Sequence, residues 1–296
     1  MQLTILGTSA TIPTKKRNHG GYLLTYKAEG LLFDCGEGIQ RQMKIAGISF
    51  SKITRIFLSH WHGDHMLGLP GLLQSMAMHQ YTKTLKIYGP PGSKQKYKKL
   101  LEAFESSYPI EATIQDVKEG KFLDTKDFYV EAYPLTHRTK CYGYRFVEKD
   151  RRKIKPSALK NLGIQEGPIV GKLQEGKTIT IKGKKISPEQ VSKIIKGRIF
   201  AYISDTRPNK NCKKLAKDAD LLLCESTYSS EHKEKAEEYY HMTAVEAAQI
   251  ASQNNAKKLI LTHFSARYKD ESVLEKDART VFDNTTAAKD FMKIIF

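Results

Sequence analysis

The 296-residue sequence contains no run of 18 or more apolar residues, which excludes an ordinary membrane-spanning helix. Residues 1–13 lack a basic leader followed by a long apolar stretch, so we expect no secretory signal there. Cysteines are few, and no two have the Cys-x-x-Cys spacing of a zinc ribbon; they are Cys35, Cys141, Cys212 and Cys224. Their spacing predicts free thiols in a reducing cytoplasm.

Acidic residues are scarce compared with basic ones. The chain has 49 Lys and Arg against 32 Asp and Glu, which gives a formal net charge of +17. Such an excess favours a polyanionic partner, because binding to phosphates releases counterions. The alternative is a basic protein with no role in nucleic-acid binding. The length and the 40% hydrophobic content suit one large α/β domain or two small ones.

The basic residues are concentrated in residues 149–197, which we call the basic segment. It contains 13 Lys or Arg and four Asp or Glu, a difference of +9, and it contains no Phe, Tyr or Trp. Proteins that bind single strands usually offer aromatic platforms for bases, so this composition fits phosphate contacts on a duplex better. A solvated insertion with exposed lysines is the alternative. Turn residues and the alternating stretch TITIKGKKI, with Gly183 near its turn, predict a protruding arm containing a small hairpin. Its apolar content is expected to be too low for a core of its own.

The stretch SHWHGDH at 59–65 concentrates side chains that bind metals. Three of the nine histidines and an aspartate lie within it, around a glycine. A polar surface loop with chance histidines is the alternative. A metal site requires further ligands from elsewhere in the chain.

Five apolar runs of strand type each end in a residue with metal-ligand or acid chemistry. The residues that follow these runs are His60, His137, Asp205, Glu225 and His263. In an α/β sheet the carboxyl ends of the strands line the site, so we expect these side chains to meet. A helix is expected over 242–253 between two of the runs, because this stretch is rich in alanine.

The same residue types are the usual ligands of a two-metal site. Imidazole suits Zn²⁺, carboxylates can bridge two ions, and two ions close together can stabilise a phosphoryl transition state. The sequence supplies seven candidate ligands: His60, His62, Asp64, His65, His137, Asp205 and His263.

The sequence resembles the metallo-β-lactamase superfamily, whose HxHxDH motif matches residues 60–65. It resembles one branch of that superfamily, ribonuclease Z, over nearly the whole chain. The matching stretches are GTSATIPTKKRN at 7–18, FDCGEG at 33–38, SDT at 204–206, ESTY at 225–228, HMT at 241–243 and THFSARY at 262–268. The resemblance implies a four-layer αβ/βα sandwich over residues 1–296, with the basic segment as an inserted tRNA-binding arm.

The resemblance also implies roles for individual residues. It assigns a first zinc to His60, His62 and His137, and a second zinc to Asp64, His65 and His263, with Asp205 bridging the two. Manganese is the alternative metal. Asp64 would also accept the proton of the attacking water. His241 would contact the scissile phosphate or protonate the leaving oxygen, and Glu225 would orient His241.

The implied activity is removal of 3′ trailers from precursor tRNA by a homodimeric cytoplasmic enzyme. The cut would follow the discriminator base and leave a 3′-hydroxyl on the tRNA and a 5′-phosphate on the trailer. Residues expected to contact RNA are Lys15, Arg17, Asn18, Thr206 and Arg267, and in the arm Gly167, Pro168 and Lys172. Asp34 is expected to orient the motif loop by hydrogen bonds, and His19 is expected to be an ordinary loop residue.

Two other functions remain open. The same fold serves phosphodiesterases that act on small esters, and such an enzyme would not need the basic segment for its natural substrate. An RNA-binding protein with an inert site is the second alternative, although it would have no need for the complete ligand set.

Overall fold

The computed structural model describes residues 1–103, 110–165, 167–181 and 183–296. The chain divides into two compact units, which are described separately. The first unit consists of Met1–Asp124, Val130–Phe146 and Ile199–Phe296, and the second consists of Thr125–Tyr129 and Val147–Arg198.

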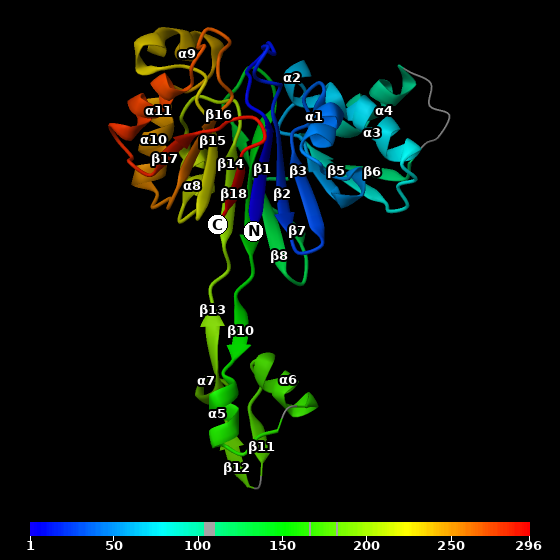
Figure 1. Cartoon of the computed structure of the whole chain (residues 1–296), viewed down its shortest axis with the longest axis vertical. Helices are drawn as coiled ribbons and strands as arrows, with labels where there is room; N and C mark the ends of the chain where they lie inside the picture. Colours follow the sequence, from blue (N-terminus) through cyan, green and yellow to red (C-terminus); the bar gives the residue numbers. More distant parts are fainter. Residues whose placement is uncertain (104–109, 166, 182) are drawn as a thin grey trace. The chain divides into compact units, whose positions relative to one another are not determined.

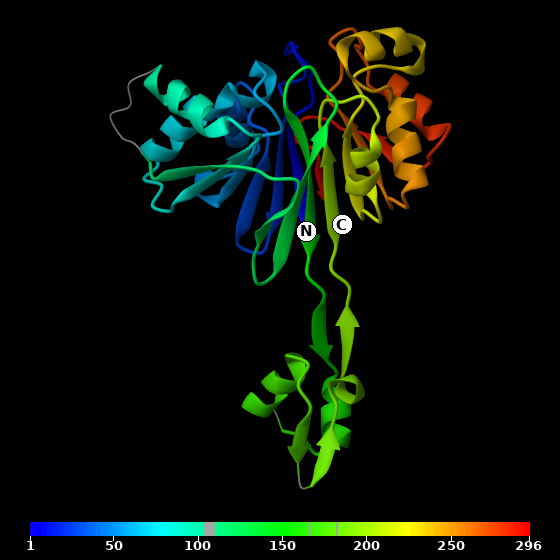
Figure 2. The ribbon, with the colours of Figure 1, turned by 180° about the vertical axis from the view of Figure 1, so that it is seen from behind.

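The first unit contains two seven-stranded sheets, which form its two central layers (Figures 1 and 2). The first sheet has the order β18-β1-β2-β3-β4-β5-β6. Its first four strands are antiparallel neighbours, and β3 to β6 are parallel. The strands are β1 (Gln2–Gly7), β2 (Gly21–Tyr26), β3 (Glu29–Phe33), β4 (Arg55–Phe57), β5 (Leu85–Gly89), β6 (Ala112–Asp116) and β18 (Lys293–Ile295).

The second sheet has the order β17-β16-β15-β14-β9-β8-β7, and β14 to β17 are parallel neighbours. Strands β14, β15 and β16 are buried almost throughout, which explains why they read as nearly continuous apolar runs in the sequence. The strands are β7 (Gly120–Asp124), β8 (Phe128–Leu135), β9 (Cys141–Glu148), β14 (Ile199–Ile203), β15 (Leu221–Glu225), β16 (Leu259–Thr262) and β17 (Thr285–Ala287).

Helices cover the outer face of each sheet (Figure 1). The first sheet carries α1 (Ile39–Ile45), α2 (Gly63–Met66), α3 (Gly68–Met78) and α4 (Ser93–Glu102). The second carries α8 (Lys210–Ala216), α9 (Lys233–Tyr239), α10 (Ala244–Gln253) and α11 (Ser272–Arg279). Two short 3₁₀ turns lie at Phe50–Lys52 and Ser230–His232. The predicted four-layer α/β sandwich is therefore confirmed for this unit.

Helix α10 confirms the helix predicted over 242–253, with its start moved to Ala244. Thr243 and Glu246 form a capping box, in which each side chain bonds the other residue's backbone amide. The cap stops the helix from extending back to residue 242, so His241 and Met242 stay in the loop that faces the site.

Aromatic side chains fill the space between the two sheets. Phe33 and Phe57 from the first sheet are stacked, with ring centroids 5.0 Å apart. Phe33 also meets Phe200 and Tyr202 of the second sheet edge-on, at 5.2 and 6.1 Å. Such rings bury large apolar areas in preferred offset or edge-to-face geometries, which holds the two layers in a defined arrangement.

The second unit contains β10 (Arg151–Ile154) paired with β13 (Ser192–Ile195), and the hairpin of β11 (Ile179–Ile181) with β12 (Lys184–Ile186). Its helices are α5 (Pro156–Asn161), α6 (Pro168–Gln174) and α7 (Pro188–Val191). The hairpin is as predicted. The expectation that this segment lacks a core is wrong, because six apolar residues are buried together: Leu159, Ile164, Leu173, Ile179, Ile186 and Val191. Five of them lie in the three helices and the hairpin, and Ile164 lies in the loop after α5. Because they are spread over several short elements, the sequence pattern alone did not reveal that they cluster.

Within the described ranges, no helix has the length and apolar character needed to cross a bilayer. All four cysteines are free, as predicted, and the structure places all four in buried positions.

Candidate metal centre and catalytic site

The site lies where several buried strands end, as the sequence predicts. Strand β4 leads to His60, β8 to His137, β14 to Asp205 and β16 to His263, while Glu225 is the last residue of β15. Helix α2 carries Asp64 and His65. Residues that are far apart in the chain therefore project into one region.

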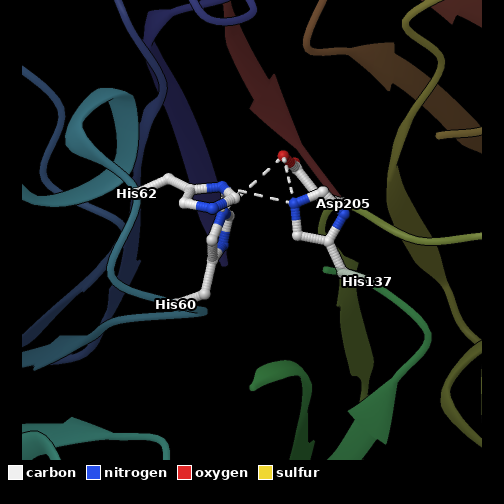
Figure 3. A group of neighbouring side chains, drawn as sticks. All are labelled: His60, His62, His137 and Asp205. Atoms are coloured by element: carbon white, nitrogen blue, oxygen red, sulfur yellow. Dashed lines mark hydrogen bonds and ion pairs between the residues drawn. The ribbon is translucent and has the colours of Figure 1, made fainter. Parts of the chain in front are cut away.

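A first group of donor atoms is formed by His60, His62, His137 and Asp205, whose ligand atoms all lie within 4.8 Å of one another (Figure 3). His62 Nδ1 is 3.0 Å from His60 Nε2 and 3.3 Å from His137 Nε2. Two imidazole nitrogens at such a distance cannot both present lone pairs to each other without a proton or a cation between them. The arrangement therefore fits a cation held by three imidazoles and a carboxylate.

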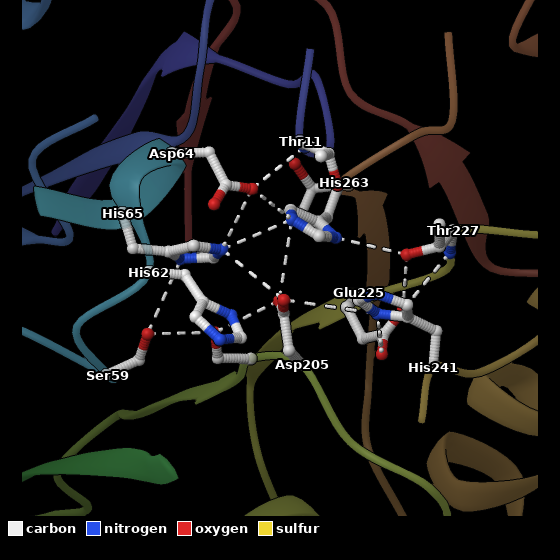
Figure 4. Close-up of polar contacts among 12 residues, drawn as sticks. Thr11, Ser59, His62, Asp64, His65, Asp205, Glu225, Thr227, His241 and His263 are labelled. Carbon is white, nitrogen blue, oxygen red and sulfur yellow. Dashed lines mark hydrogen bonds and ion pairs between the residues drawn. The ribbon is translucent and has the colours of Figure 1, made fainter. Parts of the chain in front are cut away.

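A second group is formed by Asp64, His65 and His263 (Figure 4). His65 Nε2 and His263 Nε2 are 3.2 Å apart, and each lies 3.4 Å from Asp64 Oδ2. The third close group of donors, Asp205 with His241 and His263, overlaps the first two.

The carboxylate of Asp205 is shared by both groups. Its Oδ2 lies 3.7 Å from His60 Nε2 and 3.4 Å from His65 Nε2, and its Oδ1 lies 3.5 Å from His263 Nε2. Asp205 is 3% exposed, so water does not screen these contacts. A carboxylate in this position is suited to bridge two cations.

The protonation preferences of the first group suit a metal ligand set. Burial lowers the pKa of His60, His62 and His137, and neighbouring imidazoles lower them further. Burial would raise the pKa of Asp205, but the surrounding histidines outweigh this effect and hold its pKa well below the usual value. Metals bind neutral imidazole and ionised carboxylate, so these residues are already in their binding forms. Imidazole and carboxylate donors together fit a divalent transition-metal ion.

The histidine rings are oriented by partners on their other nitrogen. Ser59 Oγ lies 3.0 Å from His60 Nδ1, and Thr227 Oγ1 lies 3.0 Å from His263 Nδ1. His137 Nδ1 donates to the carbonyl of Tyr240, at 3.2 Å. Such outer partners fix the tautomer and direct Nε2 toward the centre. Ser59, Thr227 and Tyr240 are not among the predicted site residues, since a hydroxyl or carbonyl group that orients a metal ligand leaves no distinctive sequence pattern.

Asp34 has the structural role that the sequence predicts for it. Its carboxylate accepts from His65 Nδ1 at 2.8 Å, from the backbone amide of Ser59 at 2.6 Å and from the hydroxyl of Tyr202 at 2.6 Å. It thus connects the motif loop to the second sheet. Asp34 belongs to neither group of metal donors.

Glu225 and His241 form a buried pair beside the metal donors. Glu225 is fully buried and accepts from His241 Nδ1 at 3.1 Å, from the backbone amides of Thr206 and Met242 at 2.9 and 3.1 Å, and from Thr227 Oγ1 at 2.8 Å. Burial lowers the pKa of His241, but the Glu225 carboxylate and its hydrogen bond outweigh burial and raise that pKa to about 9. At neutral pH the imidazole is therefore protonated and able to donate.

The site opens into a cavity of about 560 Å³. The metal donors His62, Asp64, His137 and Asp205 line it together with His241. Exposed apolar and cationic side chains form its mouth: Ile12, Leu67, Arg138 and Tyr239.

The structure separates the predicted RNA contacts into two classes. Lys15, Arg267 and, in the second unit, Gly167, Pro168 and Lys172 are exposed, and Asn18 is half-buried. Arg17 and Thr206 are buried and have partners within the protein. Arg17 donates to the carbonyls of Tyr268 and Ser265, at 2.6 and 3.3 Å. The Thr206 hydroxyl donates to the Arg207 carbonyl, at 2.7 Å. Arg17 and Thr206 therefore have structural contacts within the protein, and their contact with RNA stays a prediction.

Comparisons with known proteins match this chain over its full length. It is 41% identical to ribonuclease Z of Methanothermobacter thermautotrophicus over 295 residues, covering 99% of this chain and 96% of that protein. It is 43% identical to ribonuclease Z of Protochlamydia amoebophila over 297 residues, with 99% and 96% covered. The crystal structure of the short form of human tRNase Z (ELAC1) superposes with a TM-score of 0.70 at 29% identity, covering 100% of this chain and 99% of that one. The family model described as anti-Pycsar protein Apyc1 matches residues 1–147.

The pairing of His241 with Glu225 predicts how the histidine titrates. Replacing Glu225 by Gln in the metal-free protein removes the charge and leaves the burial, so the pKa of His241 should fall from about 9 to below its ordinary value of about 6.5. An NMR titration of the His241 ring measures this change.

The same pair contributes to stability in a defined pH range. Because the folded-state pKa is raised, the contribution is fully present below pH about 6.5 and is lost as the pH rises toward 9. Metal-free Glu225→Gln should lack this loss in denaturant unfolding measured across that range. An unchanged His241 pKa in the variant would contradict the assignment.

Proposed function

This chain belongs to the ribonuclease Z family of metal-dependent endoribonucleases, and from that membership we propose that it removes 3′ trailers from precursor tRNA. The identity of 41–43% over the full length carries the proposal. The two alignments cover 99% of this chain, so they span the basic segment as well as the metal donors. The proposed cut follows the discriminator base and leaves a 3′-hydroxyl on the tRNA and a 5′-phosphate on the trailer.

The donor geometry supports a pair of zinc ions, with manganese as the alternative. His60, His62 and His137 would hold one ion, Asp64, His65 and His263 the other, and Asp205 both. Such ions, when bound, polarise phosphoryl oxygens and make a nearby water more acidic.

The protein's own residues would move the protons of the reaction. Asp64 would accept a proton from the water that attacks phosphorus. The bond from phosphorus to the 3′ oxygen then breaks, and protonated His241 would give its Nε2 proton to that oxygen. Its Nδ1 is bonded to Glu225, so Nε2 is the nitrogen left to face the cavity. General acid and base groups of this kind contribute about 10²–10⁴-fold each to a rate.

The basic segment would bind the tRNA through its phosphates. Its +9 charge excess fits phosphate contacts, and Lys172 is exposed in the last turn of α6. The proposal also includes a homodimer and a cytoplasmic location. The four free thiols agree with a reducing compartment.

A precursor tRNA labelled at its 5′ end and carrying a 3′ trailer tests the activity. We expect one cut next to the acceptor stem, which a chelator abolishes and added Zn²⁺ or Mn²⁺ restores. Asp64→Ala should reduce the rate at least about 100-fold while tRNA binding persists, because the variant loses a metal donor and a proton acceptor but keeps every residue of the basic segment.

Two results would redirect this proposal. Metal-dependent hydrolysis of a small phosphodiester without cleavage of the tRNA precursor would favour a small-ester phosphodiesterase. Full cleavage by Asp64→Ala would show that the metal donors are assigned incorrectly.

The role of the basic segment is tested by replacing residues 150–196 with a short glycine-serine linker. The ends can be joined because the Glu148 amide donates to the Arg198 carbonyl at 2.9 Å. The variant should bind tRNA more weakly and with a flatter salt dependence, by about 0.7–0.9 in the log–log slope for each phosphate that it no longer neutralises. Its hydrolysis of a small phosphodiester should match that of the intact chain. An unchanged tRNA affinity in a filter-binding titration would refute the proposed arm.

A further inference from the structure

The metal donor Asp64 is held by a backbone amide from another part of the chain. Thr11 N–H donates to Asp64 Oδ2 at 2.8 Å, on the same oxygen that faces His65 and His263 (Figure 4). A carboxylate has two equivalent oxygens, and a donor on one of them fixes which way the group is turned. The position of Thr11 therefore sets the orientation of Asp64.

Thr11 adopts a backbone conformation that its side chain disfavours. Its φ is 55°, in the left-handed region, where a β-branched residue is an outlier. Such a conformation is unfavourable and persists only where surrounding contacts impose it. In this conformation the Thr11 amide bonds Asp64 while the Thr11 carbonyl meets His19, so the contacts that impose it bear on the metal site.

His19 makes one of these contacts. Its Nε2 lies 3.1 Å from the Thr11 carbonyl, and because a carbonyl can only accept, Nε2 carries the hydrogen. Ser9 Oγ supports the next residue by donating to the Ile12 carbonyl at 2.6 Å. Two consecutive carbonyl groups of this turn, those of Thr11 and Ile12, are therefore held by side chains.

The His19 ring is itself held in place. The residue is 4% exposed, and its other ring nitrogen, Nδ1, has no hydrogen-bond partner among the described residues, since the Glu37 carboxylate lies 4.0 Å away. An added Cβ at Gly36 would lie 2.5 Å from His19 Cβ and 2.4 Å from the Asp64 carbonyl oxygen. His19 and the backbone of Asp64 therefore both pack closely against the same glycine. A polar nitrogen buried without a hydrogen bond is unfavourable, so an apolar side chain would be more stable here if packing were its only role.

We propose that His19 is a positioning residue for the metal site: it holds Thr11 in the left-handed conformation, and the Thr11 amide then orients Asp64 as a ligand. The inference rests on the proposed metal ligands and adds a residue outside both donor groups. The order of transmission is His19 Nε2 to Thr11 carbonyl, Thr11 amide to Asp64 Oδ2, and Asp64 to the ion that it shares with His65 and His263.

Metal affinity, measured without RNA, tests the proposal. Metal-free protein is titrated with Zn²⁺ against a chromophoric chelator, which resolves the two binding steps. His19→Phe keeps a planar ring of similar size and removes the donor. We expect it to weaken one of the two steps about 10-fold or more, as partners of metal ligands typically do, and to leave the other step unchanged.

Two further variants make the comparison specific. His19→Gln can place an amide N–H near the Thr11 carbonyl and should recover most of the affinity that His19→Phe loses. His79→Phe, at the exposed C-terminal end of α3, is the matched control and should bind both ions as the unaltered chain does. If His19→Phe does not fold, His19→Asn replaces it, because its amide is one methylene shorter than that of Gln and cannot reach.

The outcomes separate this inference from the proposed function. Unchanged affinity in folded His19→Phe would overturn the inference, and so would an equal loss at both steps, which indicates general destabilisation. An equal loss in His19→Gln and His19→Phe would overturn it as well. Failure of the unaltered chain to bind two ions, or to cut precursor tRNA while binding them, would instead count against the proposed function.

Discussion

The convergence of imidazole rings on the carboxylate of Asp205 is the constraint on which the rest of the structure depends. His60, His65, His137, His241 and His263 all place a ring nitrogen within 3.4–3.9 Å of this one side chain. Crowded ring nitrogens are unfavourable unless protons or cations lie between them, and a buried carboxylate is unfavourable without donors around it. Each group thus stabilises the other, and divalent metal bound among them would meet both requirements.

The fold satisfies this constraint by ending buried strands at a common edge. Parallel β14, β15 and β16 deliver Asp205, Glu225 and His263 from neighbouring positions, and β4 of the other sheet delivers His60. The aromatic layer between the sheets, in which Phe33 and Phe57 meet Phe200 and Tyr202, keeps the two sets of strand ends opposed. Packing between the two sheets therefore contributes to the placement of the donor atoms.

Three buried carboxylates lie within this region, and their partners give them different roles. Asp205 faces the cluster of imidazoles, Asp34 is bonded to Ser59, His65 and Tyr202, and Glu225 is bonded to backbone amides and His241. Of these three, only Asp205 has both oxygens close to histidines of the metal site. The oxygens of Asp34 and Glu225 already accept hydrogen bonds, so these two carboxylates act through the histidines that they orient.

The sequence by itself determined the chemistry of the site and the strands that carry it. The apolar runs before His60, Asp205 and His263 are strands buried on both faces, which must be apolar throughout, and the run before His137 is a strand whose burial alternates. The polar residue after each run marks its end. The spacing within 60–65 and the family resemblance then identified the donor set. These features are local in the chain, so they could be read without a structure.

Only the tertiary structure decided which polar residues face the protein and which face the cavity. Lys15 and Arg17 are two positions apart, yet one is exposed and the other donates to carbonyls of residues 265 and 268. His19, which looks like a loop residue, is buried against Gly36 and bonded to Thr11. The small core of the second unit likewise joins residues from several short elements. Such contacts bring together distant parts of the chain, and their partners are set by packing, which leaves no periodic pattern in the sequence.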